Sequence, residues 1–144
     1  MSITRITDHF SLAEAACHSG APLPYELLPD ARYLASAVLE PLRARWGGPI
    51  VIISWYRDPA YNARIGGAEH SQHMEGRAVD CRPAELDALP RFRAVIEDMI
   101  HESKMGALGG MGWYPGRWVH LDTGPRHSDG GIRRWDGKGV GSEQ

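Results

Sequence analysis

Hydrophobic residues recur with helical spacing in two long stretches of the chain. Between residues 27 and 42 they fall three and four positions apart, which predicts a helix that begins near Pro29. Pro41 lies inside this pattern, so we expect the helix to bend or to be interrupted there. Residues 84–101 have the same spacing and predict an amphipathic helix, whose first turn Pro90 separates from the rest.

Two shorter helices are predicted by their first residues. Ser11 and Glu14 have the spacing of a capping box, in which each side chain binds the other residue's backbone N–H. Pro59 can open a second short helix that extends through Arg64, because proline is favoured in the first turn.

Four segments have the composition or the alternation of β-strands. In the last of them His120 shares one face with Trp118 and Asp122, because successive side chains of a strand point to opposite sides. Helices come first and short strands with one long helix between them follow, which predicts an α+β fold. The strand segments are residues 49–54, 77–81, 108–114 and 118–122.

Composition places the chain among ordinary globular proteins. It has 144 residues, of which 42% are hydrophobic and 24% charged, so we expect one domain over residues 1–136 and a flexible polar tail over 137–144. The net charge of −2 disfavours a nucleic-acid partner. No apolar run reaches the ~20 residues of a membrane span, and the first ten residues lack the apolar core of a signal peptide. Cys17 and Cys81 are expected to be reduced, buried thiols.

The segment of residues 71–80 carries the sharpest chemical signal. It places His73 in a loop and Asp80 on the strand that follows, and His120 lies forty residues further on. Two imidazoles and one carboxylate are a catalytic zinc set, because a fourth position stays free for a water whose pKa zinc lowers to about 7. Spacing alone leaves an alternative, in which a loop histidine binds backbone, the aspartate ends a strand and the second histidine packs beside Trp118.

The pattern Ser71-x-His73-x-x-Gly76-x-Ala78-x-Asp80 resembles the signature of the M15 zinc peptidases, which include D-alanyl-D-alanine carboxypeptidases and phage endolysins. The last of the matching segments resembles a compact branch of that family with murein endopeptidases. The similarity runs from about residue 8 to residue 136 and implies a small antiparallel sheet flanked by helices, with the zinc site on the sheet, as in hedgehog-like folds. Further matching segments are residues 10–14, 52–57, 62–68 and 118–122, with Arg134-Trp135 beyond them.

The resemblance assigns functions to individual residues. It implies that the two histidines and the aspartate named above, His73, Asp80 and His120, bind one Zn²⁺ per chain. Arg57 matches an arginine that faces the substrate, where its planar guanidinium suits a carbonyl oxygen or carboxylate and can stabilise an oxyanion. A surface salt bridge is the alternative for Arg57. Both Ser71 and Gln72 are expected to contact substrate or to orient the loop, with loop capping as the alternative.

One position departs from the family pattern. Much of the family has an acidic general base three residues before the last histidine ligand, where this chain has Arg117, which stays protonated. Asp122 lies two residues beyond His120 on the same strand face and is our catalytic candidate, while Glu69 and His70 are further ones. Two other interpretations stay open: zinc alone supports slow hydrolysis, or the site binds metal without catalysis.

These features predict a zinc metallopeptidase that hydrolyses peptidoglycan stem peptides or cross-links, as a D,D-carboxypeptidase or an endopeptidase, with zinc-activated water as nucleophile. The alternative is a non-catalytic metal-binding structural module, for example of a phage particle. Because the substrate lies outside the cytoplasm, we expect a protein made in the cytoplasm and released to the cell wall, as phage lytic proteins are. The sequence makes no prediction of oligomeric state.

Two sets of residues outside the signature complete the expectations. The glycines within residues 109–112 predict a tight strand or a close approach of chain near the site. Three arginines are expected on a solvated face that could attract anionic wall polymer. They are Arg126, Arg133 and Arg134.

Overall fold

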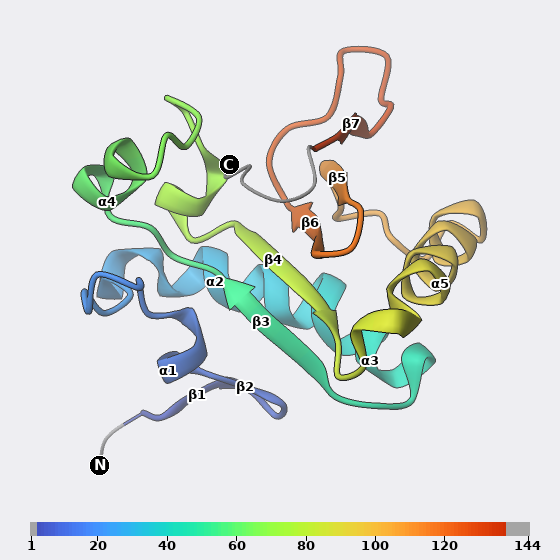
Figure 1. Ribbon diagram of the computed structural model, residues 1–144, viewed down its shortest axis with the longest axis horizontal. Coiled ribbons are helices and arrows are strands. Elements are labelled where there is room, and N and C mark those ends of the chain that lie inside the picture. Colours follow the sequence, from blue (N-terminus) through green and yellow to red (C-terminus); the bar gives the residue numbers. More distant parts are fainter. Residues whose placement is uncertain (1–2, 138–144) are drawn as a thin grey trace.

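A five-stranded sheet forms the centre of the computed structural model, which describes residues 3–137. Its strand order is β3-β4-β6-β5-β7, and all neighbours are antiparallel except β7, which runs parallel to β5 (Figure 1). The α+β prediction is confirmed, and the sheet is mixed at one edge. The strands are β3 Ile50–Ser54, β4 Ala78–Pro83, β5 Gly110–Tyr114, β6 Trp118–Asp122 and β7 Arg133–Asp136, and a separate pair is β1 Arg5–Thr7 with β2 Phe10–Ser11.

Helices occur where the hydrophobic pattern predicts them. They are α1 Leu12–Ala15, α2 Leu28–Leu34, α3 Glu40–Trp46, α4 Pro59–Arg64 and α5 Leu89–His101, with short 3-10 helices at Tyr25–Leu27, Gln72–Glu75 and Leu86–Ala88. The capping box of Ser11 and Glu14 is present at the start of α1. The helix predicted over residues 84–101 is divided near Pro90: Leu86–Ala88 form a 3-10 helix, and α5 begins at Leu89 with Pro90 in its first turn.

The predicted interruption near Pro41 takes the form of a π-helical segment, Ala35–Leu39, between α2 and α3. There the N–H of Glu40 donates to the carbonyl of Ala35, five residues earlier. A proline ring presses on the carbonyl four positions before it, which here belongs to Ala37. The wider turn directly before Pro41 accommodates that ring and keeps the helix continuous.

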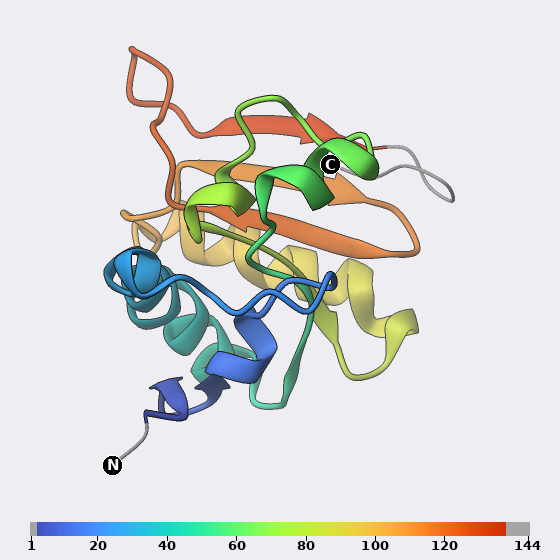
Figure 2. The same cartoon turned by 90° about the vertical axis from the view of Figure 1, so that its left-hand side faces the viewer.

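One face of the sheet packs on helices α2, α3 and α5, which lie together below the strands in Figure 2. Alternate residues of the two central strands point into this core and are fully buried; they are Val79, Cys81, Val119 and Leu121. They meet apolar side chains of α2 and α5, such as Leu34, Phe92 and Ile96. Cys17 and Cys81 are both free and buried, as predicted.

The opposite face of the sheet carries α4 and the 3-10 helix Gln72–Glu75, shown in green in front of the orange strands in Figure 2. Asp58 caps α4 by accepting the N–H of Tyr61 at 2.7 Å. Gly76 ends the 3-10 helix with a φ of 72°, a left-handed conformation that glycine adopts without strain, and the chain then enters β4. This turn holds the 3-10 helix above the strand that contains Asp80.

The sequence did not indicate the β1–β2 pair or β7. The Arg-Arg-Trp-Asp sequence of β7 lacks an apolar alternation, because one of its faces looks onto polar groups. Gly137 is bound to the sheet, since its N–H donates to the carbonyl of Trp113 at 2.7 Å. The rest of the predicted flexible tail, residues 138–144, lies outside the described residues, and the single-domain assignment stays a prediction. Among the described residues no helix is long and apolar enough to cross a membrane.

Candidate metal centre

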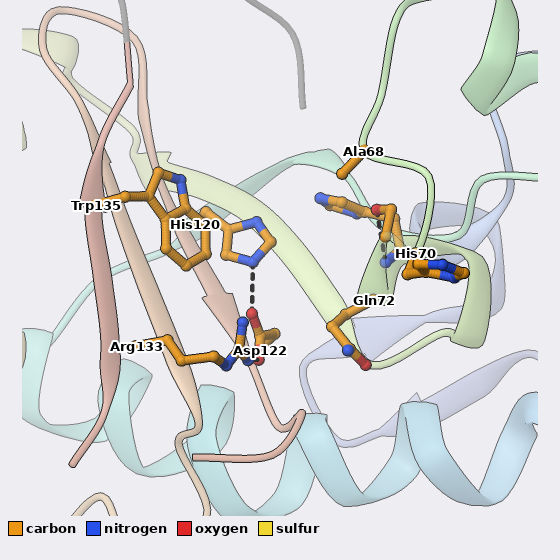
Figure 3. A pocket seen from close by; sticks show the side chains of 9 residues that line it. Ala68, His70, Gln72, His120, Asp122, Arg133 and Trp135 are labelled. Atoms are coloured by element: carbon orange, nitrogen blue, oxygen red, sulfur yellow. Dashed lines mark hydrogen bonds and ion pairs between the residues drawn. The ribbon is translucent and has the colours of Figure 1, made fainter. Parts of the chain in front are cut away.

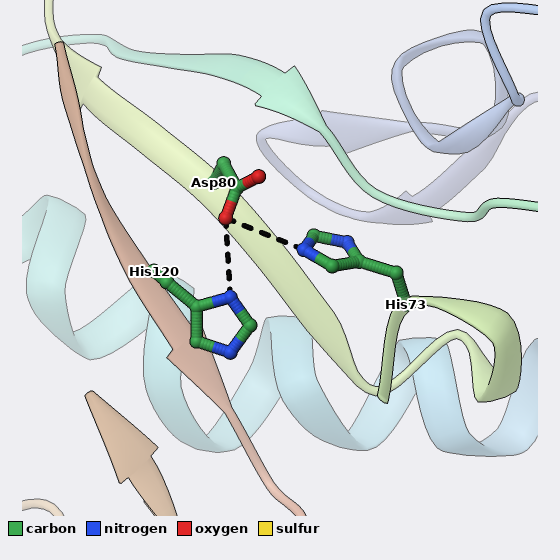
Figure 4. Close-up of side chains that lie close together, drawn as sticks. All are labelled: His73, Asp80 and His120. Carbon is green, nitrogen blue, oxygen red and sulfur yellow. Dashed lines mark hydrogen bonds and ion pairs between the residues drawn. The ribbon is translucent and has the colours of Figure 1, made fainter. Parts of the chain in front are cut away.

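Three predicted ligands come together on the polar face of the sheet. The register of β4 and β6 places Asp80 directly beside His120. His73 reaches the same point from the 3-10 helix above them (Figure 4). One ligand atom of each residue lies within 4.8 Å of the others, and all three residues are buried. Residues forty positions apart in sequence therefore form one compact cluster.

The protonation of His73 follows from its hydrogen bonds. Its Nδ1 donates to the carbonyl oxygen of Trp55 at 2.7 Å, since a carbonyl can only accept. Burial lowers the pKa of His73 despite the opposing charge of Asp80, so the ring is neutral at pH 7 and Nε2 carries a lone pair. Within residues 3–137 this buried Nε2 has no hydrogen-bond partner, and it lies 3.3 Å from Oδ1 of Asp80. Two acceptors that face each other in this way are stabilised by a cation between them.

His120 lies between two carboxylates. Its Nδ1 is 3.1 Å from Oδ1 of Asp80, and its Nε2–H donates to Oδ2 of Asp122 at 2.7 Å. Burial lowers the pKa of His120, but the hydrogen bonds to Asp122 and Asp80 outweigh it and raise that pKa above its usual value. The contacts with both histidines likewise outweigh burial and hold the pKa of Asp80 well below its usual range. Asp80 is therefore ionised at neutral pH.

The donor set fits zinc. Nε2 of His73, Nδ1 of His120 and a carboxylate oxygen of Asp80 are the ligand types that zinc prefers, and three protein ligands leave a coordination position open. The outer nitrogen of each histidine is held by an acceptor, a carbonyl for His73 and Asp122 for His120, which is the usual surrounding of a metal-bound imidazole.

Arg57 supports the third ligand from behind. Its Nη2 donates to Oδ2 of Asp80 at 3.1 Å, and its other nitrogens lie 3.3 Å from Oγ of Ser54 and 3.5 Å from Oδ1 of Asn62. Both members of the Arg57–Asp80 pair are only 1% exposed, so this is no surface salt bridge. A substrate contact of Arg57 stays a prediction.

A cavity of about 250 Å³ opens onto both histidine ligands. Figure 3 shows its two walls: His120, Asp122, Arg133 and Trp135 on one side, and the loop with Ala68, His70 and Gln72 on the other. Among the predicted residues, Ser71 accepts the N–H of His73 at 3.2 Å and caps the 3-10 helix. Gln72 lines the cavity, and its buried Oε1 has no hydrogen-bond partner in the part of the chain that the structure describes. His70 also lines this space.

Comparison with known proteins decides the family. The family model described as peptidase M15 matches residues 8–122. The chain belongs to the peptidase M15 family. This M15 peptidase is also similar to the probable peptidoglycan L,D-endopeptidase MepK of Haemophilus influenzae, with 31% identity over 94 residues that cover 61% of this chain and 43% of that protein. The chain thus spans less than half the length of this relative. M15 peptidases are zinc-dependent hydrolases, in agreement with the donor set described above.

Asp122 is held at both of its oxygens in this M15 peptidase. Its Oδ2 accepts a hydrogen bond from Nε2 of His120. Its Oδ1 accepts the N–H of Gly124 at 2.9 Å and forms an ion pair with Arg133. The expectation that Arg133 lies on a solvated face is wrong, because β7 brings this arginine over the sheet to a buried carboxylate. A general-base function for Asp122 stays a prediction, while its contacts support the orientation of His120.

Trp135 was not predicted to line the site of this M15 peptidase. Its ring lies 4.9 Å from the ring of His120. It can lie there because Gly112, directly beside His120 in the sheet, has no side chain: a Cβ would come within 2.6 Å of the indole. The expected close approach of chain at these glycines is therefore present. Gly110 and Gly112 alternate on one face of β5, and that alternation was the signal that another element covers this face.

Proposed function

We propose that this M15 peptidase is a zinc-dependent enzyme that hydrolyses peptide bonds in peptidoglycan stem peptides or cross-links. The observation that carries the proposal is the buried cluster of His73, Asp80 and His120 at the base of an open cavity. Endopeptidase action is favoured over D,D-carboxypeptidase action by the similarity to the probable peptidoglycan L,D-endopeptidase of Haemophilus influenzae. The protein acts at the cell wall and binds one Zn²⁺ per chain.

The chain prepares the ligands before zinc binds. Each ligand has one partner that fixes its orientation: the carbonyl of Trp55, the guanidinium of Arg57 and the carboxylate of Asp122. Such partners raise metal affinity, because the ligands lose little freedom on binding. When bound, zinc polarises the scissile carbonyl and activates a water as the nucleophile.

Other residues of the chain act on the substrate and on the developing charge. Arg57 places a buried positive charge beside Asp80, where it stabilises negative charge that develops on the carbonyl oxygen. The Oε1 of Gln72, which no described residue binds, accepts a backbone N–H of the peptide in the cavity, and Ser71 holds the loop in place. Asp122 fixes the proton of His120 on Nε2, so that Nδ1 faces the metal.

Zinc content and peptidoglycan cleavage, measured on the same preparations, test this proposal. Protein purified without added metal should contain about one zinc per chain by elemental analysis, and folded His73→Ala and His120→Ala should contain almost none. The parent should release soluble muropeptides from purified peptidoglycan, and a chelator should stop the release until zinc is restored.

Two outcomes contradict the proposal in different ways. A parent that binds no zinc, even when zinc is offered at neutral pH, has a retained fold without a metal centre. A parent that binds zinc and cleaves no peptidoglycan is a metal-binding module, for example a structural part of a phage particle, and Arg117 in place of an acidic residue is the feature that favours this second function.

A further inference from the structure

A row of three residues joins the edge strand β7 to the strand that carries His120. Arg133 of β7 lies beside Gly110 of β5, and Gly110 lies beside Asp122 of β6. Because Gly110 has no side chain, the guanidinium of Arg133 passes over it and forms an ion pair with the carboxylate of Asp122. A Cβ at Gly110 would come within 2.8 Å of Nη2 of Arg133, so any other residue type would obstruct this contact.

The neighbouring row of the sheet ends at His120 itself. Trp135 of β7 lies beside Gly112 of β5, which in turn lies beside His120. The indole ring lies 4.9 Å from the imidazole ring, and the indole N–H donates to the hydroxyl of Tyr114 at 3.1 Å. One short edge strand therefore makes two contacts around a single candidate ligand, one through a carboxylate and one directly.

Arg133 is itself held in a fixed position. Its Nε donates to the carbonyl of Pro125 at 2.6 Å, and its backbone N–H donates to the carbonyl of Gly109 at 2.9 Å. The side chain of Arg133 is 27% exposed and that of Asp122 only 1%, so their ion pair is largely shielded from water. A buried carboxylate must be paired, and a guanidinium supplies a positive charge that is present at every pH of interest.

Asp122 connects Arg133 to the candidate ligand (Figure 3). One carboxylate oxygen, Oδ1, binds Arg133 and the N–H of Gly124, and the other, Oδ2, accepts from Nε2 of His120 at 2.7 Å. Because Oδ1 is held by two donors, the carboxylate has little freedom to rotate, and Oδ2 stays in line with the imidazole N–H. The other ring nitrogen, Nδ1, then faces Asp80 at 3.1 Å.

We propose that Arg133 is a positioning residue of the metal centre, which acts through Asp122 on His120. The inference rests on the zinc binding of the proposed function and adds a residue that supplies no ligand and lies two strands away from His120 in the sheet. Asp122 orients the imidazole, and Arg133 orients Asp122. The edge strand β7 thereby contributes to metal affinity, and loss of the guanidinium loosens the imidazole.

The zinc affinities of two arginine variants test this chain of contacts. Arg133→Gln should bind zinc about three- to tenfold more weakly than the parent, a smaller loss than the roughly 10–100-fold typical of a residue that binds the ligand directly. Arg134→Gln is the matched control, because Arg134 is the next residue of β7, points to the opposite face and pairs with Glu97 at 2.7 Å.

Competition with a chromophoric chelator measures these affinities, and urea denaturation of the metal-free proteins measures their stability. Arg134→Gln should bind zinc like the parent. A purely structural function of Arg133 would lower stability and leave the zinc affinity of the folded protein unchanged. Equal zinc affinities of Arg133→Gln and the parent would therefore overturn the inference.

A glycine variant breaks the same contact without changing a charge. Gly110→Ala places a methyl group against the guanidinium of Arg133 and should lower zinc affinity at least as much as Arg133→Gln. Gly106→Ala is its control, since a Cβ there meets no atom within 4 Å. The double variant of Gly110 and Arg133 should bind zinc no more weakly than Gly110→Ala, because both substitutions remove one contact. Additive losses would refute the connection through Asp122.

The ring N–H of His120 gives a readout that needs neither zinc nor hydrolysis. In metal-free protein with isotope-labelled histidine, the Nε2–H resonance is assigned with His120→Ala. Its exchange with solvent should be about tenfold faster in Arg133→Gln than in the parent or in Arg134→Gln, because the hydrogen bond to Asp122 opens more often.

This measurement separates the inference from the proposed function. A parent that binds no zinc, or that binds zinc and cleaves no peptidoglycan, refutes the proposed function, and faster exchange in Arg133→Gln still supports the positioning of His120. Unchanged exchange of this proton in Arg133→Gln refutes the inference and leaves the proposed function intact.

Discussion

The two faces of strands β4 and β6 are built by different rules. On the side toward the helices, the strands contribute side chains that pack in the hydrophobic core. They are Val79, Cys81, Val119 and Leu121. On the opposite side, Asp80, His120 and Asp122 are just as deeply buried, yet every one of them depends on named partners. Burial of an apolar group requires only complementary shape, whereas a buried charge must be paired.

This contrast separates stability from function within single strands. On the apolar face a truncated side chain leaves a cavity and weakens the fold. On the polar face, a truncated side chain removes a candidate ligand or the hydrogen bond that orients one. We therefore expect the metal affinity to fall more than the stability of the fold. Substitutions at neighbouring positions of one strand should therefore have opposite effects: one lowers the stability of the fold, and the other lowers the metal affinity.

The largest effect is expected at the metal ligands. His120→Ala should remove almost all bound zinc and lower peptidoglycan cleavage about a thousandfold or more, because the metal supplies several kcal/mol of transition-state stabilisation. Elemental analysis and muropeptide release measure both quantities. Zinc retained at one per chain in His120→Ala would show that the polar face binds metal elsewhere.

The neighbouring apolar position should show the reverse. Leu121→Ala removes a fully buried side chain next to His120 and should lower the free energy of unfolding by about 2–5 kcal/mol. Urea denaturation of parent and variant measures the loss. At temperatures where the variant is folded, it should keep one zinc per chain; a folded Leu121→Ala without zinc would break the separation of the two faces.

Asp122 should show an intermediate effect. Asp122→Ala should weaken zinc binding about 10–100-fold, because His120 loses the acceptor that fixes its orientation. Asp122→Asn is the matched variant: its amide keeps one oxygen that can accept from Nε2 of His120, so zinc affinity should fall less. Competition with a chromophoric chelator measures both constants. If Asp122→Asn binds zinc like the parent and still loses cleavage, the predicted general-base function gains support over the positioning function.

The smallest effect is expected at the rim of the helical side, where Glu40 of α3 contacts the β1–β2 turn. Its carboxylate accepts from Thr7 at 2.8 Å and from the ring and backbone of His9 at 2.6 and 2.9 Å. Burial raises the pKa of Glu40, but these hydrogen bonds outweigh it and lower that pKa below 4.5. A carboxylate with a lowered pKa contributes stability that is present above its unfolded pKa and lost as the pH falls through the folded one.

Glu40→Gln should therefore cost less than about 1 kcal/mol at pH 7, and the cost should shrink below pH 4. Urea denaturation at both pH values, with a chelator present so that zinc does not contribute, measures the difference between the two proteins. An equal cost at pH 3 and pH 7 would mean that Glu40 acts through packing and not through its charge.

The sequence predicted the apolar face and the ligands better than the partners of those ligands. Helical spacing and strand alternation depend on local residues, so α2, α5, β3 and β6 were expected close to where they lie. The motif brought His73 and Asp80 together, because they lie only seven positions apart in the sequence. The pairing of Arg57 with Asp80 depends on the long-range pairing of β3 with β4, which places Ser54 beside Asp80 and which no local pattern encodes.

Arg133 is a clearer case of a contact that the sequence did not predict. It is charged and is followed by a second arginine, Arg134, so the sequence predicts a solvent-exposed position. Only the parallel pairing of β7 with β5, across a chain separation of more than twenty residues, places it on Asp122 beside Gly110. Such contacts depend on strand pairing between distant parts of the chain. The residues of β7 do not have the alternating hydrophobic pattern from which such a strand could be predicted.

The position of β7 at the edge of the sheet has a consequence for how such enzymes diversify. The candidate ligands Asp80 and His120 lie on two inner strands, which are fixed by neighbours on both sides, while Trp135 comes from a strand with one neighbour. Replacing or lengthening an edge strand leaves the register of the inner strands unchanged. Selection can therefore reshape the wall that meets the substrate at this edge while the ligand strands are inherited intact.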